Sequence, residues 1–281
     1  MVKREYTGKY FRITYTLEEE GPHPTVPHDY YDDTYTITAI FQGEGVCYIE
    51  GNANKLSPGT IVMMSPEEIR SFRLTQTGCH ERLSLYFSDA ILSPVWEYEL
   101  PQIQALRVRT PGSGNAYLPQ RYDTGTVMPI LEKLRGIVLE GNTQKAPLAH
   151  LLILELLFAL CDAGDVQGPP TGGIAQDREI AELCKYIKEH LADDLSYKSL
   201  QKQFLLSRYQ LTDVFRRNTG ITLTEYILCK RLMQSMSLVR GGESIENAAW
   251  QAGFHTYSHF YKEFRKHYRM SPRQYFADRK L

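Results

Sequence analysis

The side chains with the clearest capacity for chemistry lie near the C-terminus, along one predicted helix. Phe254, Phe260 and Phe264 recur at the spacing of an apolar helix face. The polar face that remains consists of Tyr257, Ser258, His259, Tyr261 and Lys262. These side chains donate and accept hydrogen bonds, and a helix fits the major groove of DNA, which is about 12 Å wide. The pattern predicts contacts to the edges of base pairs.

The residues before this helix have the spacing of a helix-turn-helix. Ser244 is a good N-cap for a short helix over 245–252. Ala249 is small enough for two helices to touch, and Gly253 can adopt the positive φ of a tight turn. The first helix and its turn would therefore hold the polar helix in place.

An earlier segment repeats this order of short helix, turn and longer helix. Leu211 and Phe215 are its inward residues. Its outward residues are Arg208, Tyr209, Thr212, Asp213 and Arg216. In the two units together, Arg216, Lys262 and Arg265 are expected to touch phosphates, which position a protein on DNA without reading its sequence.

A predicted helix over 222–239 joins the two units. Its 18 residues give a rod of roughly 27 Å at about 1.5 Å per residue. Major grooves on one face of DNA repeat about every 34 Å. A stiff helix can therefore place two recognition helices in successive grooves, a register that a flexible loop could not fix.

The charge distribution favours a polyanionic partner for the C-terminal part. Residues 178–281 contain 18 Lys and Arg against 11 Asp and Glu, a net charge of +7, which leaves −8 for residues 1–177 out of the total of −1. Chance segregation of solvated charge is the alternative. The charge changes sign at 163–177, a Gly- and Pro-rich stretch that predicts a flexible linker between a domain at 1–162 and one at 178–281.

The C-terminal sequence resembles the AraC/XylS family of bacterial transcription regulators. The resemblance rests on residues 220–231, on 244–254 with its Ala-x-x-x-Gly-Phe pattern, and on 260–275 with Phe-x-x-x-Phe-Arg and Ser-Pro-x-x-Tyr. It implies double-stranded DNA and RNA polymerase as partners, and activation as the commoner outcome.

The first unit departs from the family pattern. Gln201 and Leu205 stand where Ala and Gly are usual at the helix contact and the turn, which puts the geometry of that turn in question. Asp213 lies at a position often used for base contact. It either accepts from a cytosine amine or caps a neighbouring charge, and we favour the second.

Between residues 10 and 90 the sequence alternates as short strands do, with β-branched and aromatic residues at period two. The predicted strands are 10–17, 35–41, 46–50, 60–64, 71–75 and 82–87, separated by turn signals such as Ser57-Pro-Gly59. This spacing predicts an antiparallel barrel or sandwich. Helical periodicity follows over about 126–160.

This half resembles the cupin-type barrel of the arabinose-regulator branch of the family. The fold class that the whole chain indicates is thus two-domain: an all-β cupin-like barrel with flanking helices on its C-terminal side, then an all-α domain with two helix-turn-helix units. The ligands of metal-dependent cupins are missing, because His28 stands alone and Arg70 lies where a barrel histidine often falls. A metal needs three or more convergent ligands, so we expect no metal, no other cofactor and no enzyme activity.

A barrel of about eight strands can hold one small ligand. By alignment with the arabinose-binding pattern, the resemblance implies an effector pocket lined by Tyr30, Arg70, Phe72, Arg82 and Ser84. Aromatic faces with a few polar groups suit a sugar or a similar polar molecule. The alternative is that Tyr30 and Phe72 fill the core.

The helices at 126–161 resemble the family's dimerisation helices, which implies a homodimer. Their i, i+4 ridge consists of Leu148, Leu152, Leu156 and Leu160. The alternative is that these helices only cover the barrel.

The composition fits a soluble protein, with 42% hydrophobic and 23% charged residues. The longest apolar run, 151–161, is about half of a bilayer span, and the N-terminus lacks the apolar run of a secretory signal. We therefore expect a cytoplasmic transcription regulator, without membrane contact, that responds to a small effector. Two alternatives remain: a regulator whose barrel serves only to dimerise, and a cupin enzyme with an accessory nucleic-acid-binding domain.

Overall fold

The structure, a computed structural model, describes residues 1–19, 34–66, 68–75, 78–88, 90–92, 112, 115–117, 124–162 and 178–278. The chain divides into two units, Met1–Ala175 and Gln176–Leu281. The linker predicted over 163–177 lies outside the described residues, so the predicted domain boundaries stay a prediction.

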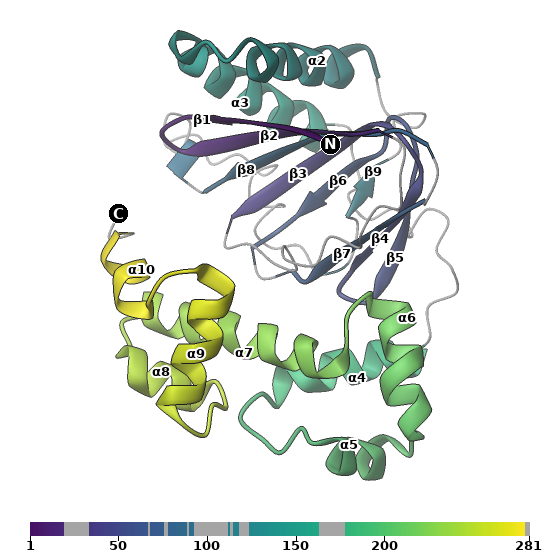
Figure 1. Cartoon of the computed structure of the whole chain (residues 1–281), viewed down its shortest axis with the longest axis vertical. Coiled ribbons are helices and arrows are strands. Elements are labelled where there is room, and N and C mark those ends of the chain that lie inside the picture. Colours follow the sequence, from purple (N-terminus) through teal and green to yellow (C-terminus); the bar gives the residue numbers. More distant parts are fainter. Residues whose placement is uncertain are drawn as a thin grey trace. The chain divides into compact units, whose positions relative to one another are not determined.

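The first unit contains two antiparallel sheets (Figure 1). Its described strands are β1 Val2–Thr7, β2 Phe11–Glu18, β3 Tyr35–Gln42, β4 Gly45–Ile49, β5 Asn52–Leu56, β6 Ile61–Met64, β7 Arg70–Leu74, β8 His80–Phe87 and β9 Ala116–Tyr117. The larger sheet has the order β1-β2-β8-β3-β6-β9, and the smaller one has the order β5-β4-β7. The six strands predicted from alternation are confirmed within one or two residues at each end.

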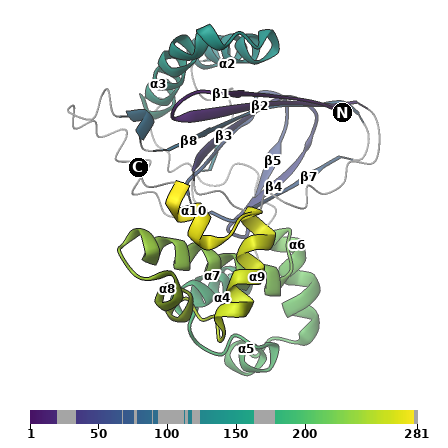
Figure 2. The same ribbon diagram turned by 60° about the vertical axis from the view of Figure 1, so that its left-hand side comes forward.

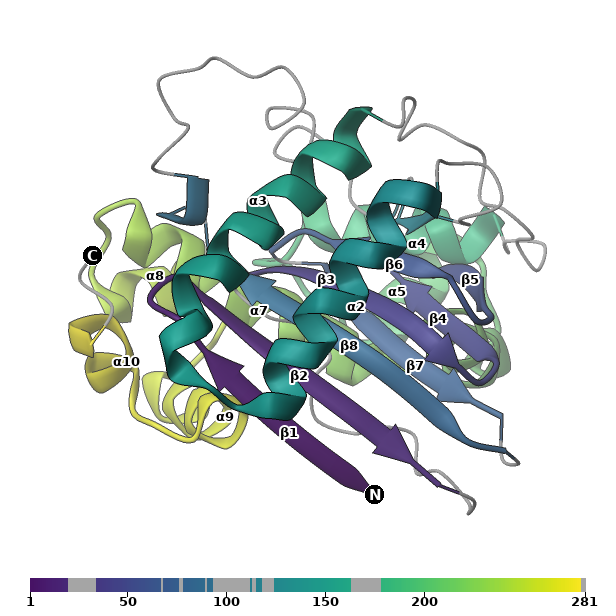
Figure 3. The ribbon, with the colours of Figure 1, turned by 90° about the horizontal axis from the view of Figure 1, so that it is seen from above.

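The outer face of the larger sheet is apolar and is covered by two helices, α2 Thr124–Glu140 and α3 Ala146–Asp162. Figure 3 shows both helices lying over its strands. Ile13 pairs with Leu85, and Leu85 pairs with Ile37, so one row of side chains crosses three strands on this face. These rows and the buried faces of both helices form the largest core of the unit.

Apolar side chains fill only one part of the space between the two sheets, next to β3, β4 and β6. Ile40, Val62 and Met64 of the larger sheet pack there against Cys47 and Ile49 of β4. Burial raises the pKa of the Cys47 thiol well above its usual range, which keeps this side chain neutral in the core. Toward β2 and β8, polar side chains replace the apolar ones.

The leucine ridge predicted for dimerisation faces inward. Leu152, Leu156 and Leu160 are buried in the core against the larger sheet, and only Leu148, 48% exposed, reaches the surface. An i, i+4 row lies along one face of a helix, and α3 uses that face to cover its own sheet. Leu152, Leu156 and Leu160 therefore contact their own sheet, as the covering alternative anticipated, and Leu148 alone of the four stays available for a dimer contact.

The second unit is helical throughout its described residues (Figure 2). Its elements are α4 Arg178–Glu189, α5 Tyr197–Phe204, η4 Gln210–Val214, α6 Phe215–Thr219, α7 Leu223–Arg240, α8 Ile245–Gln251, α9 Tyr257–Tyr268 and α10 Pro272–Asp278. Thr222 caps α7, because its hydroxyl accepts from the Glu225 amide and the Glu225 side chain bonds back to the Thr222 amide. The helices predicted over 222–239 and 245–252 are confirmed, and the longer helix of the earlier unit contains a π-helical turn, η4.

Candidate nucleic-acid interface and effector cavity

The turn between α8 and α9 has the geometry expected of a helix-turn-helix. Ala249 is buried at the helix contact, and the Phe254 amide donates to the Ala249 carbonyl at 3.1 Å. Gly253 has φ +91°, and a Cβ at this position would collide with the carbonyl oxygen of Leu191. Arg231 Nε of α7 donates to the same carbonyl at 3.0 Å. Two constraints, positive φ and close approach of the backbone, thus require glycine at 253.

Helix α9 buries its apolar face and exposes its polar one. Thr256 caps it by accepting from the His259 amide, and Phe254, Phe260 and Phe264 are buried. The exposed residues include every predicted DNA contact of this unit, namely Tyr257, Ser258, His259, Tyr261, Lys262 and Arg265. Tyr257 and Tyr261 are 41% and 37% exposed, and their rings lie 6.3 Å apart. The face can therefore reach a groove, and base contact by these residues stays a prediction.

The first unit presents a comparable face. Leu211 and Phe215 are buried. The predicted outward residues Arg208, Tyr209, Asp213 and Arg216 are exposed, and Thr212 is half-buried. Arg217 Nη2 donates to the Tyr209 hydroxyl at 2.9 Å, and its guanidinium lies 5.6 Å from the centre of that ring. Arg217 was not among the predicted residues, and it holds the ring of Tyr209 in place.

The turn after α5 has the backbone conformation that glycine usually supplies there, although its residue is Leu205. Leu205 follows α5 with φ 55° and ψ 27°, in the left-handed region, and its side chain is 90% exposed. The conformation costs an L-residue roughly 1–2 kcal/mol. The departure from the family pattern is therefore accommodated by local strain.

Asp213 does not cap a neighbouring charge within the part of the chain that the structure describes. Its Oδ2 accepts from the hydroxyl of Thr212 at 2.8 Å. We had favoured a charge-capping role for Asp213. The structure corrects this interpretation, because the partner of the carboxylate is a neutral hydroxyl. The role of Asp213 as a base-contacting acceptor stays a prediction.

Helix α7 connects the two units as one continuous element. Tyr226, Leu232 and Met236 are buried along it. Figure 1 shows α5 and α6 at one end of α7, and α8 and α9 at the other. The arrangement matches the stiff connection expected from the sequence.

The first unit holds a cavity of about 230 Å³ between its two sheets. Its lining is Met1, Lys3, Thr14, Thr16, Glu18, Thr36, Thr38, Arg70, Ser71, Phe72, Arg82, Ser84 and Tyr86. The list contains Arg70, Phe72, Arg82 and Ser84, so four predicted pocket residues from β7 and β8 come together at one cavity. The fifth, Tyr30, lies outside the described residues.

Strand register explains why this cavity is polar. Thr14 pairs with Ser84, and Ser84 pairs with Thr38, so one row of hydroxyl groups crosses β2, β8 and β3 on the inner face. The hydroxyls of Thr38 and Ser84 lie 3.0 Å apart. One step along, Arg82 Nη2 donates to Glu18 Oε1 at 2.9 Å.

One hydroxyl at the cavity has no hydrogen-bond partner within the described residues. It is Thr36 Oγ1 on β3, whose side chain is almost fully buried. A buried hydroxyl without a partner costs about 1–3 kcal/mol. The polar lining distinguishes this cavity from the apolar core on the other side of the larger sheet.

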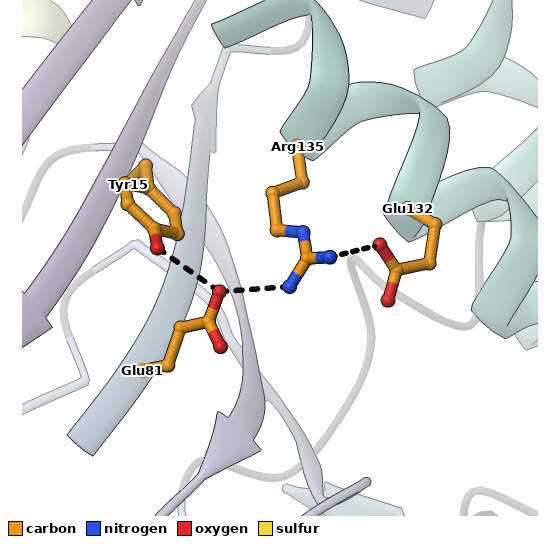
Figure 4. A network of polar contacts seen from close by, with 4 residues as sticks. All are labelled: Tyr15, Glu81, Glu132 and Arg135. Atoms are coloured by element: carbon orange, nitrogen blue, oxygen red, sulfur yellow. Dashed lines mark hydrogen bonds and ion pairs between the residues drawn. The ribbon is translucent and has the colours of Figure 1, made fainter. Parts of the chain in front are cut away.

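A polar network on the outer face ties the same strands to α2 (Figure 4). Glu81 Oε1 accepts from the Tyr15 hydroxyl at 3.0 Å and from Arg135 Nη1 at 2.8 Å. Arg135 Nη2 also pairs with Glu132 at 2.7 Å. Burial and the hydrogen bond to Glu81 raise the pKa of Tyr15 above its usual value.

Two further properties bear on the class of protein. Among the described residues, no group of three or more His, Cys, Asp and Glu side chains is placed to hold a metal, and His28 lies outside them. One helical segment, Thr143–Leu160, is long and apolar enough to cross a membrane by composition alone. Its leucines at 152, 156 and 160 are core residues of the first unit.

Comparison with known families gives matches over both units. A model described as an AraC-like ligand binding domain matches residues 23–160, and one described as a helix-turn-helix domain matches 200–278. A relative named HTH-type transcriptional activator RhaS, from Salmonella schwarzengrund (strain CVM19633), is 22% identical over 263 residues, which cover 92% of this chain and 90% of the relative. Its namesake from Enterobacter sp. (strain 638) is 23% identical over 266 residues, with the same coverage.

Solved structures are also similar to the chain. ToxT from Vibrio cholerae O395 aligns with a TM-score of 0.42 and 14% identity, over 95% of this chain and 98% of that one. A cupin protein from Bacteroides fragilis aligns with a TM-score of 0.28 and 16% identity, over 31% of this chain and 77% of that one. The matched domains and the named relatives are those of a transcription regulator and not of an enzyme.

Proposed function

Since this chain belongs to the AraC family of DNA-binding transcription regulators with a ligand-binding domain, we propose that it activates transcription when a small polar effector occupies the cavity of its first unit. The observation that supports the effector site is the polar lining of that cavity, with buried hydroxyls on β2, β3 and β8. A sugar is the simplest occupant, because its hydroxyl groups would satisfy those on the strands. The activating role follows the names of the relatives.

The second unit binds DNA through two faces. Tyr257, Ser258, His259 and Tyr261 of α9 read base edges, and Lys262 and Arg265 touch phosphates. Arg208, Tyr209, Thr212, Asp213 and Arg216 form the second face. Exposure of these side chains supports both assignments. The domains are 1–162 for the effector and 178–281 for DNA, with a linker over 163–177, and the protein acts in the cytoplasm.

The active form is a homodimer that uses the exposed side of α3 and not the buried Leu152, Leu156 and Leu160. Leu148 and Leu151, 48% and 64% exposed, lie on the outer side of α3, and Leu139 is exposed near the end of α2. Exposed large apolar side chains on one helix pair favour burial against a second copy. RNA polymerase is the further partner of an activator.

The effector and DNA sites are thermodynamically linked in this scheme. An effector that favours one arrangement of the dimer changes the affinity for DNA, and DNA changes the affinity for the effector by the same factor. A barrel that serves only to dimerise is the competing function. It predicts no such linkage.

The test measures DNA affinity with and without candidate effectors. Full-length protein first selects its binding sites from a random DNA pool. Fluorescence anisotropy on a selected site is then recorded against a panel of sugars and organic acids, together with thermal unfolding. A ligand at a hundred times its Kd adds about 2.7 kcal/mol of stability. Effector-dependent DNA affinity supports the proposal, and a panel without any effect on either readout supports the dimerising barrel.

A further inference from the structure

Strand β1 lies at the end of the larger sheet, and among the described strands it pairs only with β2. All of its residues are exposed except Tyr6. An edge strand presents a row of backbone N–H and C=O groups that can pair with a strand of another chain. A second molecule can therefore add to the sheet at β1.

The turn after β1 fixes which backbone groups point outward. The Gly8 amide donates to the Phe11 carbonyl at 2.9 Å, so residue 8 directs its backbone groups toward β2. The register between the two strands runs without a shift, and the direction of these groups alternates along an antiparallel strand. Lys3, Glu5 and Thr7 therefore direct their amides and carbonyls away from β2.

A second copy of β1 fits this edge with opposite charges face to face. Two antiparallel copies of one edge are related by a two-fold axis, and residues opposite each other then share a face of the joined sheet. With the axis at Arg4, Lys3 of each copy lies opposite Glu5 of the other, and both direct backbone groups into the interface. An axis at Lys3 or at Glu5 would place like charges directly opposite, which destabilises a strand pair.

The charged side chains of the edge have contacts that are compatible with this pairing. Arg4 would meet its own counterpart at the axis, but its Nη1 donates to the Leu139 carbonyl of α2 at 2.9 Å. That bond directs the guanidinium to its own helix, which limits repulsion between the copies. Glu5 lies 3.8 Å from Arg12, and its side chain is 47% exposed. A carboxylate can accept from a second cation, so Lys3 of the other copy can join this pair.

The corner between α2 and α3 connects this edge to the exposed leucines. The Tyr6 hydroxyl donates to the Asn142 carbonyl at 3.0 Å, near the bond between Arg4 and Leu139. Figure 3 shows this corner beside β1. Leu139 and Leu148, on either side of the corner, are both exposed. Stable interfaces bury about 1,200–2,000 Å² in total, so a strand pair needs such flanking apolar side chains.

We propose that two copies of the chain dimerise through antiparallel pairing of their β1 strands about an axis at Arg4, with Lys3 of each copy opposite Glu5 of the other. The larger sheets of the two copies then continue across the interface, and the exposed leucines of the α2–α3 corners flank it. The assignment rests on the proposed homodimer and extends its α3 surface to β1.

Disulfide trapping in the full-length protein tests the register. The two residues at the axis form a non-hydrogen-bonded pair with Cα atoms about 4.5 Å apart, which is within the range for a disulfide. Oxidation of Arg4→Cys is expected to link most of the protein into dimers. Thr7→Cys is the matched control, because Thr7 is exposed on the same edge and would lie about 20 Å from its counterpart. Both variants carry Cys79→Ser, because Cys79 is partly exposed. Linkage of Arg4→Cys no greater than that of Thr7→Cys would overturn the register.

Exchange of charges tests the pairing independently. Lys3→Glu and Glu5→Lys each place like charges opposite each other, twice per dimer, and each is expected to weaken dimerisation at least tenfold in sedimentation equilibrium. The double variant restores opposite charges and should dimerise within threefold of the parent protein. Single variants as tight as the parent, or a double variant as weak as the single ones, would contradict the pairing.

The outcomes separate this inference from the homodimer it rests on. A dimer that Leu151→Arg dissociates, but that responds to none of the changes on β1, keeps the α3 contact and removes the strand pairing. A parent protein that sediments as a monomer at every concentration removes both.

Discussion

Glu81 and Arg82 are neighbours on β8 whose side chains leave the sheet on opposite faces. Glu81 accepts from Arg135 of α2 at 2.8 Å, and Arg82 donates to Glu18 at the cavity at 2.9 Å. One strand thus contacts the helix pair with one residue and the cavity lining with the next. Strand β2 alternates in the same way. The Tyr15 hydroxyl donates to Glu81 on the helix side, whereas its neighbours Thr14 and Thr16 line the cavity.

Loss of the Arg135 guanidinium should destabilise the first unit. In Arg135→Gln the half-buried carboxylate of Glu81 loses its charged partner, and we expect a loss of about 1–2 kcal/mol in the free energy of unfolding. Urea unfolding measures it. Glu132→Gln is the control, because that carboxylate is largely exposed and its pair should contribute below about 1 kcal/mol. Equal losses in both variants would show that Glu81 has no special dependence on Arg135.

Tyr15 should make the stability of the first unit sensitive to alkaline pH. Its folded pKa is raised above the value of about 10 in unfolded chains. The contribution is therefore fully present below pH 10 or so and is lost as the pH rises through the folded pKa. Tyr15→Phe should flatten this part of the curve of unfolding free energy against pH. A curve as steep as that of the parent protein would disprove the contribution.

The two turns should respond in opposite directions to substitution. Gly253→Ala adds a Cβ against the Leu191 carbonyl at positive φ, and we expect it to cost more than about 2 kcal/mol. Leu205→Gly relieves the left-handed conformation of an exposed side chain and should stabilise by up to about 1 kcal/mol. Thermal unfolding of the two variants gives the comparison. A destabilising Leu205→Gly would mean that the side chain makes contacts its exposure does not suggest.

Two buried hydroxyls of the first unit should differ in their effect on its stability without ligand. Ser84→Ala removes a hydrogen bond to Thr38 and should cost about 1 kcal/mol. Ser71→Ala removes a buried hydroxyl without a partner in the described residues, and we expect no loss of stability. Unfolding without ligand tests the pair. A larger loss in Ser71→Ala than in Ser84→Ala would show that Ser71 is satisfied in the empty protein.

The strands and helices with strong local signals were predictable from the sequence. Alternation identified β3 and β8, and the N-cap Ser244 identified the start of α8. Strand β5, Asn52–Leu56, was missed because it contains no β-branched residue and gains its place by pairing with β4. The π-helical turn in 210–214 has no sequence pattern of its own.

The candidate site residues, like the helices and strands, were only partly predictable from the sequence. Periodicity separated the buried and exposed faces of α9 because one helix with three Phe residues has a single way to pack. The leucine ridge of α3 was misassigned because the same i, i+4 row serves an internal contact or a dimer, and the sequence does not say which surface it meets. Thr36 was not predicted as a pocket residue, since only strand register brings it to the cavity.

The most direct test of the account is the affinity of α9 variants for a DNA site selected by the full-length protein. Tyr257→Ala and Lys262→Ala should each weaken specific binding at least fivefold, and Lys262→Ala should also lower the salt slope by about one. Lys185→Ala, an exposed cation of α4, is the control with the same change of charge and should bind like the parent protein. Parental affinity in both α9 variants, measured by anisotropy on correctly folded protein, would contradict the assignment of this helix as the recognition element.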